Sequence, residues 1–235
     1  MTKGKSPLFF KDYYYQVKYK CSFKALARRT IKPYMLVLEA GGGKRSVIGE
    51  CNLKADHIVG MDIALDDIEE NPSLDFKLIG HLENLPFKRE VFDVIICRNV
   101  VEHLRNPYKV FKEFQSILKK EGCLLVRTPN LCNPIIVLSR ILPLNMRTWV
   151  KKNIFHDSEG DTFPTYHRCN TKGRLLNAFN ALGFQSDFHS YDGLMAYFDF
   201  SRILISFIVL YEKITDLKVL RWLKMWIILS VSKAD

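Results

Sequence analysis

The sequence predicts a single-domain α/β fold with a seven-stranded, mostly parallel sheet sandwiched by helices. From residue 35 onward, short apolar runs alternate with segments of helical periodicity, which is typical of βαβ units. A chain of 235 residues has the size of one such domain, and its 48% hydrophobic residues are enough to build a core. The ordinary glycine and proline content excludes collagenous and low-complexity proteins.

The expected strands are continuous apolar runs rich in Val, Ile, Leu and Phe, as in strands that are buried on both faces of a sheet. Five of them lie before residue 130, and two more close the domain near the end of the chain. The ranges are Met35–Ala40, Ile58–Ile63, Phe76–Gly80, Phe92–Cys97, Cys123–Thr128, Phe184–Tyr191 and Trp226–Lys233.

Two helices have clear boundary signals. The first is expected over Pro107–Lys120, because Asn106 can cap its start, proline suits the first helical position, and Gly122 follows its end. The second begins at Thr171 and stops at Gly183. Together with the strands, these helices complete the predicted alternation.

The basic excess is concentrated at the N-terminus. Residues 1–33 carry nine Lys or Arg against Asp12, which is +8 of the total +10 and leaves +2 for the rest. A basic, aromatic arm of this kind suits nucleic acid or an anionic membrane surface. We favour a packing helix with a solvated basic face, because an apolar stripe recurs at helical spacing. That stripe is Phe10, Tyr14, Val17, Cys21 and Ala25.

The expected organisation is therefore a cap segment at residues 1–33 followed by one domain at 34–235. Within that domain, residues 131–170 are irregular and contain Pro134, Pro143 and Pro164. This stretch follows the fifth strand, where an open α/β sheet carries a substrate-covering insertion.

Cysteine usage predicts a cytoplasmic protein with reduced thiols, and peripheral attachment at a membrane stays open. The N-terminus lacks the apolar core of a signal peptide. The apolar run Ile203–Tyr211 is much shorter than the roughly 20 residues of a membrane span. None of the six cysteines forms a C-x-x-C pair: they are Cys21, Cys51, Cys97, Cys123, Cys132 and Cys169.

No metal cofactor is expected. The acids Asp157, Glu159 and Asp161 alternate as in a calcium loop. However, the sixth position of such a loop would be Thr162 instead of glycine, and the twelfth would be Arg168 instead of glutamate.

A glycine-rich turn and an acid mark a nucleotide site. Gly41–Gly43 directly follow the first strand, so the backbone there can approach a ligand without side-chain obstruction. Asp62 ends the second strand, where a carboxylate can accept both ribose hydroxyls of an adenosine cofactor. Ser46 stands where a nicotinamide fingerprint needs its third glycine, which argues against NAD.

The sequence resembles the class I S-adenosylmethionine-dependent methyltransferases of the type 11 group, which have a Rossmann-like fold. The blocks that carry the resemblance occur in the family's order across residues 35–130. They are VLEAGGG (37–43), VGMDIA (59–64), LPF (85–87) followed by VFDVII (91–96), VEHL (101–104) and LKKEGCLLVRTPN (118–130). A weaker likeness covers DTFPTYHRCNT (161–171).

The resemblance implies S-adenosyl-L-methionine as the cofactor and places it at the strand ends. Glu39 would lie near the amino group of its methionine part, Asp62 would bind the ribose, and Met61 or Ile63 would flank the adenine. Cys97, Arg98 and Asn99 would lie near the sulfonium. The whole expected cofactor set is Glu39, Gly41, Gly43, Met61, Asp62, Ile63, His81, Leu82, Cys97, Arg98 and Asn99.

Three features depart from the family pattern. Arg45 replaces the third glycine of the motif, and Gly80–His81 stands where the family has a Gly-Asp pair that binds the adenine amino group. The crossover Lys44–Asp56 is short, and Gly49 weakens the helix expected there. Arg45 could instead pair with the carboxylate of the cofactor.

Methyl transfer is an in-line displacement, so the protein mainly aligns the acceptor and excludes water. Candidate bases are His103, His167 and Tyr166, while Glu102 could simply cap or pair on a helix. The favoured acceptor is a small molecule, such as a sugar or lipid-linked metabolite methylated on oxygen or nitrogen.

Two alternatives stay open. One is a cofactor-binding relative without catalysis, as Arg45 and His81 suggest. The other is a nucleic-acid methyltransferase that uses the basic arm, but Arg98-Asn99-Val100 is unlike the N-P-P-Y motif of enzymes that methylate flipped bases. Nucleic acid is therefore not the expected partner.

Overall fold

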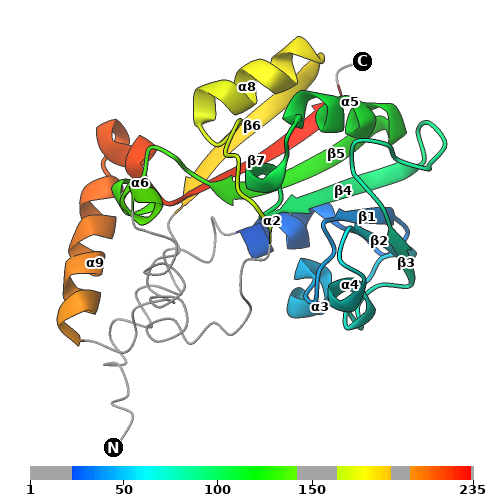
Figure 1. Ribbon diagram of the computed structural model, residues 1–235, viewed down its shortest axis with the longest axis horizontal. Helices are drawn as coiled ribbons and strands as arrows, with labels where there is room; N and C mark the ends of the chain where they lie inside the picture. Colours follow the sequence, from blue (N-terminus) through cyan, green and yellow to red (C-terminus); the bar gives the residue numbers. More distant parts are fainter. Residues whose placement is uncertain (1–22, 142–162, 192–201, 234–235) are drawn as a thin grey trace, which may run out of the picture.

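The computed structural model describes residues 23–141, 163–191 and 202–233, which form one seven-stranded sheet with helices on both faces (Figure 1). The strands are β1 Leu36–Ala40, β2 His57–Asp62, β3 Phe76–Ile79, β4 Phe92–Arg98, β5 Leu118–Pro129, β6 Phe184–Tyr191 and β7 Trp226–Lys233. The predicted fold class is confirmed, and every predicted strand is present with ends that differ by a few residues at most, except at β5.

The strand order is β3-β2-β1-β4-β5-β7-β6. The pairs from β3 through β5 are parallel, whereas β7 runs antiparallel to both of its neighbours. The chain moves outward from β1 to β3 and then returns to place β4 on the other side of β1. In open α/β sheets, ligands bind outside the carboxyl ends of the strands at such a reversal.

The helices and short 3₁₀ turns separate the strands in sequence. They are α2 Phe23–Thr30, α3 Val47–Cys51, α4 Leu65–Glu69, η2 Val101–His103, α5 Pro107–Ile117, α6 Pro134–Ile141, α8 Lys172–Ala181, α9 Arg202–Thr215 and η4 Lys218–Leu223. Figure 1 shows α5 and α8 over one face of the sheet, and α2, α3 and α4 against the other. Alternate strand residues supply the two apolar cores: Leu38 and Ile95 belong to the first, Val37 and Val94 to the second.

The first predicted helix is shorter than expected, which corrects its C-terminal boundary. α5 starts at Pro107 with Asn106 as its cap but ends at Ile117, and β5 begins at Leu118. Leu118 has an extended backbone (φ −76°, ψ 131°) and pairs with Phe92 of β4. The sheet therefore takes up the residues that the pattern assigned to the last helical turn. The second helix matches its prediction, with Thr171 as the cap of α8.

The N-terminal cap segment is described only from residue 23. There, α2 buries Phe23, Leu26 and Ala27 in the core that α3 and β1 share, as a packing helix would. Of the expected stripe, Ala25 alone lies in the described part, and it is half-buried. Phe10, Tyr14, Val17 and Cys21 lie outside the described residues, so the boundary at residue 33 stays a prediction.

Other sequence expectations concern absences. The five cysteines in the described part are all free thiols. Among the described residues, no group of three His, Cys, Asp or Glu could hold a metal ion, and the acids 157–161 lie outside that part. None of the helices within the described ranges is long and apolar enough to cross a membrane. The insertion at 131–170 is described only in part, and its covering role stays a prediction.

Candidate functional site

The glycine turn after β1 has a backbone that only glycine adopts easily. Gly41 has φ +77° and Gly43 has φ +37°. A Cβ on Gly41 would clash with Cγ2 of Val100, which follows β4. The amide of Gly41 donates to the carbonyl of Met61 at 2.8 Å. The turn is thus pressed between the ends of β2 and β4, at the reversal of strand order.

Asp62 holds the glycine turn from the end of β2. Its Oδ2 accepts a hydrogen bond from the amide of Gly43 at 2.9 Å, and its Oδ1 accepts one from the amide of Ala64 at 3.0 Å. A carboxylate has about four acceptor positions, so two remain for further donors. This arrangement fixes a negative charge against the turn and leaves it able to accept hydroxyl groups.

Glu39 lies one strand away and is almost fully buried, with 3% of its surface exposed. Its Oε1 accepts a hydrogen bond from the amide of Val47 at 3.2 Å, while Oε2 is buried without a hydrogen-bond partner. Burial raises the pKa of Glu39 to about 7, against the smaller opposing effects of Ser46 and Arg98. A buried carboxyl oxygen without a donor suits a cationic group of a ligand.

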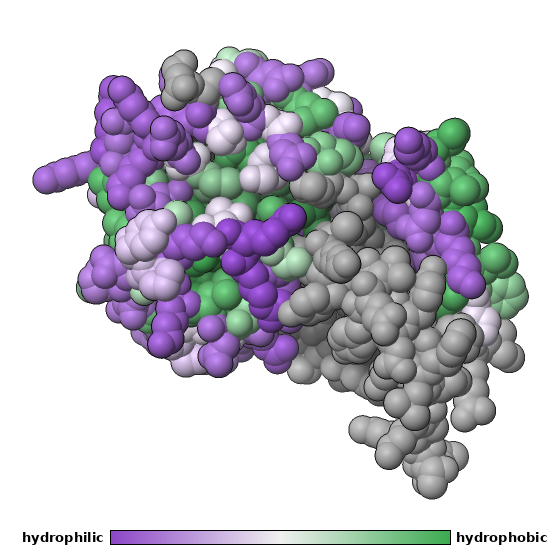
Figure 2. Space-filling view, turned by 180° about the vertical axis from the view of Figure 1, so that it is seen from behind, coloured by the Kyte–Doolittle hydropathy of each residue, from purple (hydrophilic) through white to green (hydrophobic). Residues whose placement is uncertain are grey.

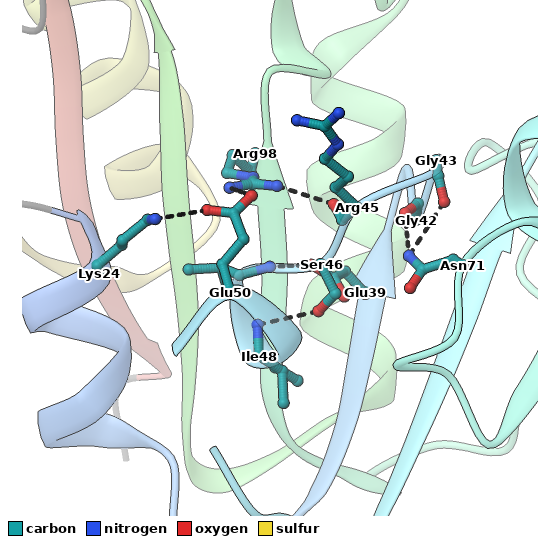
Figure 3. A network of polar contacts seen from close by, with 11 residues as sticks. Lys24, Glu39, Gly42, Gly43, Arg45, Ser46, Ile48, Glu50, Asn71 and Arg98 are labelled. Atoms are coloured by element: carbon teal, nitrogen blue, oxygen red, sulfur yellow. Dashed lines mark hydrogen bonds and ion pairs between the residues drawn. The ribbon is translucent and has the colours of Figure 1, made fainter. Parts of the chain in front are cut away.

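Asn71 completes the support of the turn, and sequence reasoning missed it. Its side chain is fully buried, and Nδ2 donates to the carbonyls of Gly42 at 2.8 Å and Gly43 at 3.0 Å (Figure 3). Its Oδ1 accepts from the amide of Ser73 at 3.1 Å. The dipeptide Asn71-Pro72 indicates a turn after a helix, but nothing in it points to the glycine turn.

Arg98 at the end of β4 ties three elements together. Its guanidinium donates to Glu50 of α3 at 2.9 Å and to the carbonyl of Arg45 at 2.8 Å. Glu50 also pairs with Lys24 of α2 at 2.9 Å. In Figure 3 the guanidinium of Arg45 points away from that of Arg98, and the Arg45 side chain is exposed. Arg98 thus has structural partners, whereas Arg45 stands at the turn with its charge in solvent.

The other expected cofactor residues differ in accessibility. Met61 is buried in the core, whereas Ile63 is 48% exposed beside the turn, so Ile63 is the better placed to contact an adenine. His81 is exposed after β3, and Leu82 behind it is buried. Cys97 is fully buried in the first core, and burial raises the pKa of its thiol. Asn99 is exposed with φ +59° after β4.

The three candidate bases come together around Glu102. The amides of Tyr166 and His167 donate to the carbonyl of Glu102 at 2.7 and 3.0 Å, and Nδ1 of His103 lies 3.1 Å from the carbonyl of Pro164. Because a carbonyl only accepts, Nδ1 is the donor in this contact, and Nε2 is the ring nitrogen left for another partner. The hydroxyl of Tyr166 accepts from Arg105 at 2.7 Å, and His167 is buried with φ +50°.

Glu102 itself is part of a buried polar network. Its Oε2 accepts from the hydroxyl of Thr128 at 2.9 Å, and Nδ2 of Asn170 donates to that hydroxyl. Burial raises the pKa of Glu102. The network joins η2, β5 and the segment before α8, so it fixes the residues that carry the candidate bases. Neither Thr128 nor Asn170 was singled out from the sequence.

A family model described as a methyltransferase domain matches residues 13–192. The chain belongs to this family. Among curated proteins, an uncharacterized protein of Methanocaldococcus jannaschii is 29% identical over 138 residues, which is 58% of this chain and 51% of that protein. A second protein of the same organism matches over 52% of its length. This chain thus spans about half the length of the curated relatives that it matches.

Solved structures share the fold of this methyltransferase domain. An S-adenosylmethionine-dependent methyltransferase of Mesorhizobium loti has a TM-score of 0.57 and 14% identity, over 89% of this chain and 97% of that chain. The cyclase SpnF has a TM-score of 0.60 and 16% identity, over 90% and 80%. The class I resemblance is confirmed by these findings together with the family match. Because one fold carries more than one reaction, the activity is argued from the site.

Proposed function

We propose that this methyltransferase domain binds S-adenosyl-L-methionine and transfers its methyl group to a small-molecule acceptor. The observation that carries the proposal is the glycine turn held against Asp62 at the reversal of strand order. The backbone of the turn and the carboxylate beside it suit the ribose and the methionine part of the cofactor.

The residues present fit the cofactor. The partnerless Oε2 of Glu39 is an acceptor for the ammonium group of the methionine part, and the exposed Arg45 can pair with its carboxylate. Asp62 keeps acceptor capacity for the ribose hydroxyls. Ile63 offers an apolar surface for the adenine. The arginine that departs from the family motif thus has a binding role of its own.

The bound cofactor supplies an electrophilic methyl group, and this chain supplies alignment and a base. The segment after β4 packs against Gly41 through Val100 and continues into η2, so His103 is three residues from the side chain that meets the turn. His103 is our choice for the base because its Nδ1 donates to a carbonyl. It would take the proton that an oxygen or nitrogen acceptor loses when the methyl group arrives. The Glu102 network positions it.

The test follows a labelled methyl group. Purified protein is incubated with methyl-labelled S-adenosylmethionine and a small-molecule extract, and separately with RNA and DNA. We expect label in the small-molecule fraction and at least about tenfold less with Asp62→Ala, since a lost hydrogen bond to a charged group costs roughly 1.5–3 kcal/mol. Asp66→Ala is the matched control, because Asp66 is an exposed acid of α4 four residues later.

Other outcomes favour the alternatives. Label in RNA or DNA alone would overturn the small-molecule acceptor in favour of the nucleic-acid alternative. Cofactor binding without label in any fraction would support a relative that binds without catalysis. Equal methyl transfer by Asp62→Ala and the wild type would show that Asp62 does not bind the cofactor.

A further inference from the structure

An exposed apolar surface lies on the segment formed by α9 and η4. Six side chains between residues 207 and 222 are 44–80% exposed. They are Phe207, Leu210, Ile214, Leu217, Val219 and Trp222. Figure 2 shows hydrophobic residues gathered at its right-hand edge, where α9 lies after the half-turn from Figure 1. We call these six residues the α9–η4 surface. Apolar side chains that gather in this way mark an interaction site more often than a random surface.

The exposed apolar side chains of α9 lie on a different face of the helix from the side chains that pack into the protein. On its inner side the helix buries Ile208, Val209 and Thr215. The residues at positions 207, 210, 214 and 217 follow one another at helical spacing on the outer side. The helix is thus apolar on two sides, and only one of them faces the protein.

Most of the exposed charges on the same segment are positive. Lys213, Lys218 and Arg221 are exposed and Glu212 is buried, whereas the 41% exposed side chain of Asp216 pairs with Lys224 at 2.6 Å. Two copies of this surface would bring like charges together. An anionic lipid surface would instead attract the cations while its acyl region accepts the apolar side chains. Charge complementarity therefore favours a membrane over a second copy of the chain.

The segment is fixed to the end of β5. Nδ2 of Asn130 donates to the carbonyls of Trp222 at 2.8 Å and Lys224 at 2.7 Å. Nδ2 of Asn133 donates to the carbonyl of Leu223 at 2.8 Å. These bonds fix the end of η4, which carries Trp222, beside the end of β5.

We propose that the α9–η4 surface docks on anionic membranes, with its apolar side chains in the interface and its cations at the headgroups. The exposed Trp222 suits such a surface, since indole rings favour the boundary between headgroups and acyl chains. The proposal does not rest on the methyl-transfer function, because it concerns binding to lipid alone.

The test measures cosedimentation of the full chain with vesicles of phosphatidylcholine, with and without one third phosphatidylglycerol. We expect binding that depends on the anionic lipid. The triple variant Phe207→Ser, Leu210→Ser, Trp222→Ser is expected to bind at least about tenfold more weakly, because each removed side chain loses its burial in the interface. Lys218→Glu with Arg221→Glu is expected to weaken binding about tenfold or more while leaving the apolar residues in place.

Matched controls change similar residues elsewhere. Tyr34→Ser, Phe76→Ser, Ile79→Ser removes side chains that are 76%, 53% and 52% exposed and lie outside this segment. Lys88→Glu with Arg89→Glu repeats the charge reversal on another exposed loop. Both controls are expected to bind like wild type, and circular dichroism melting checks that every variant folds.

Three results would overturn the proposal. The wild-type chain could fail to bind anionic vesicles, or the α9–η4 variants could bind as well as the wild type. Sedimentation velocity could also show a dimer that the triple variant dissociates, which would assign the surface to contact between two copies.

Discussion

Glu39 combines a binding position with an unusual titration. Its carboxyl group is buried at the end of β1, and burial raises its pKa to about 7 from the usual 4.5. Near neutral pH the group is therefore partly protonated in the folded chain. An incoming ammonium group would favour the ionised form, so ligand binding and the release of a proton are coupled at this residue.

The raised pKa makes stability depend on pH. A carboxyl group with a higher pKa in the folded state stabilises the fold fully below the unfolded pKa, and this contribution is lost as the pH rises through about 4.5 to 7. Glu39→Gln keeps an acceptor for Val47 and removes the titration. We therefore expect the variant to match the wild type near pH 4.5 and to exceed its free energy of unfolding by about 3 kcal/mol above pH 7. Urea unfolding at several pH values measures this difference.

The matched control is Glu69→Gln, which changes an exposed acid at the end of α4. Its unfolding free energy should follow the wild type across the same range. If Glu39→Gln also ran parallel to the wild type at every pH, the pKa of Glu39 would be the same in the folded and unfolded chain, and the raised pKa would be wrong.

At this scale the sequence predicts residues whose place in a motif fixes their surroundings. Asp62 follows from its position at the end of an apolar strand, whereas Glu39 is placed by the resemblance to the methyltransferases. Asn71 could not be predicted, because its contacts with Gly42 and Gly43 depend on how α4 returns the chain beneath the turn. Cys97 lies one residue before the end of β4, and its side chain is buried in the core, which its position in the sequence alone does not indicate.

Among the elements, the glycine turn and the segment after β4 depend on each other. Gly41 leaves room for Val100, and Val100 leads into η2, which carries Glu102 and His103. The glycine turn and the candidate base are thus connected by the packing of the Val100 side chain against Gly41. A side chain at position 41 would disturb both.

Two alanine substitutions distinguish the cost of a steric clash from the cost of backbone strain at the glycine turn. Gly43→Ala meets no atom within 4 Å and is expected to cost about 1–2 kcal/mol from its positive φ alone. Gly41→Ala has the same strain and also meets Val100, so we expect a loss of roughly 2–5 kcal/mol. Urea unfolding measures both variants.

The double variant Gly41→Ala, Val100→Ala tests whether the clash with Val100 causes the larger loss of stability in Gly41→Ala. Removal of the two Val100 methyl groups should return part of the stability that Gly41→Ala loses. If the double variant were no more stable than the two single losses added together predict, the contact with Val100 would not explain the requirement for glycine.

Local sequence patterns predict the starts of the two helices but not the end of α5. Asn106, Pro107 and Thr171 act through bonds within a few residues, and both helix starts are where those signals place them. The end of α5 is decided by a partner distant in sequence, since Phe92 of β4 pairs with Leu118. A long β5 therefore replaces the last helical turn, which no local signal indicates.

On the scale of the whole molecule, the order of the strands creates the site. Residues from β1, β2 and β4 that are far apart in sequence meet because the chain reverses direction across the sheet between β3 and β4. The alternation of strands and helices predicts a mostly parallel sheet, but it does not predict the order of the strands, which depends on where the chain reverses. The α9–η4 surface could not be predicted in the same way, because its apolar pattern alone looks like core.

The measurement that tests the account most directly is a calorimetric titration of the full chain with S-adenosylhomocysteine, the product that remains after methyl transfer. The account predicts one molecule bound per chain, proton release near pH 7 in the wild type but not in Glu39→Gln, and binding at least about tenfold weaker in Asp62→Ala. Absence of binding to the wild type, or equal affinity of Asp62→Ala, would contradict it.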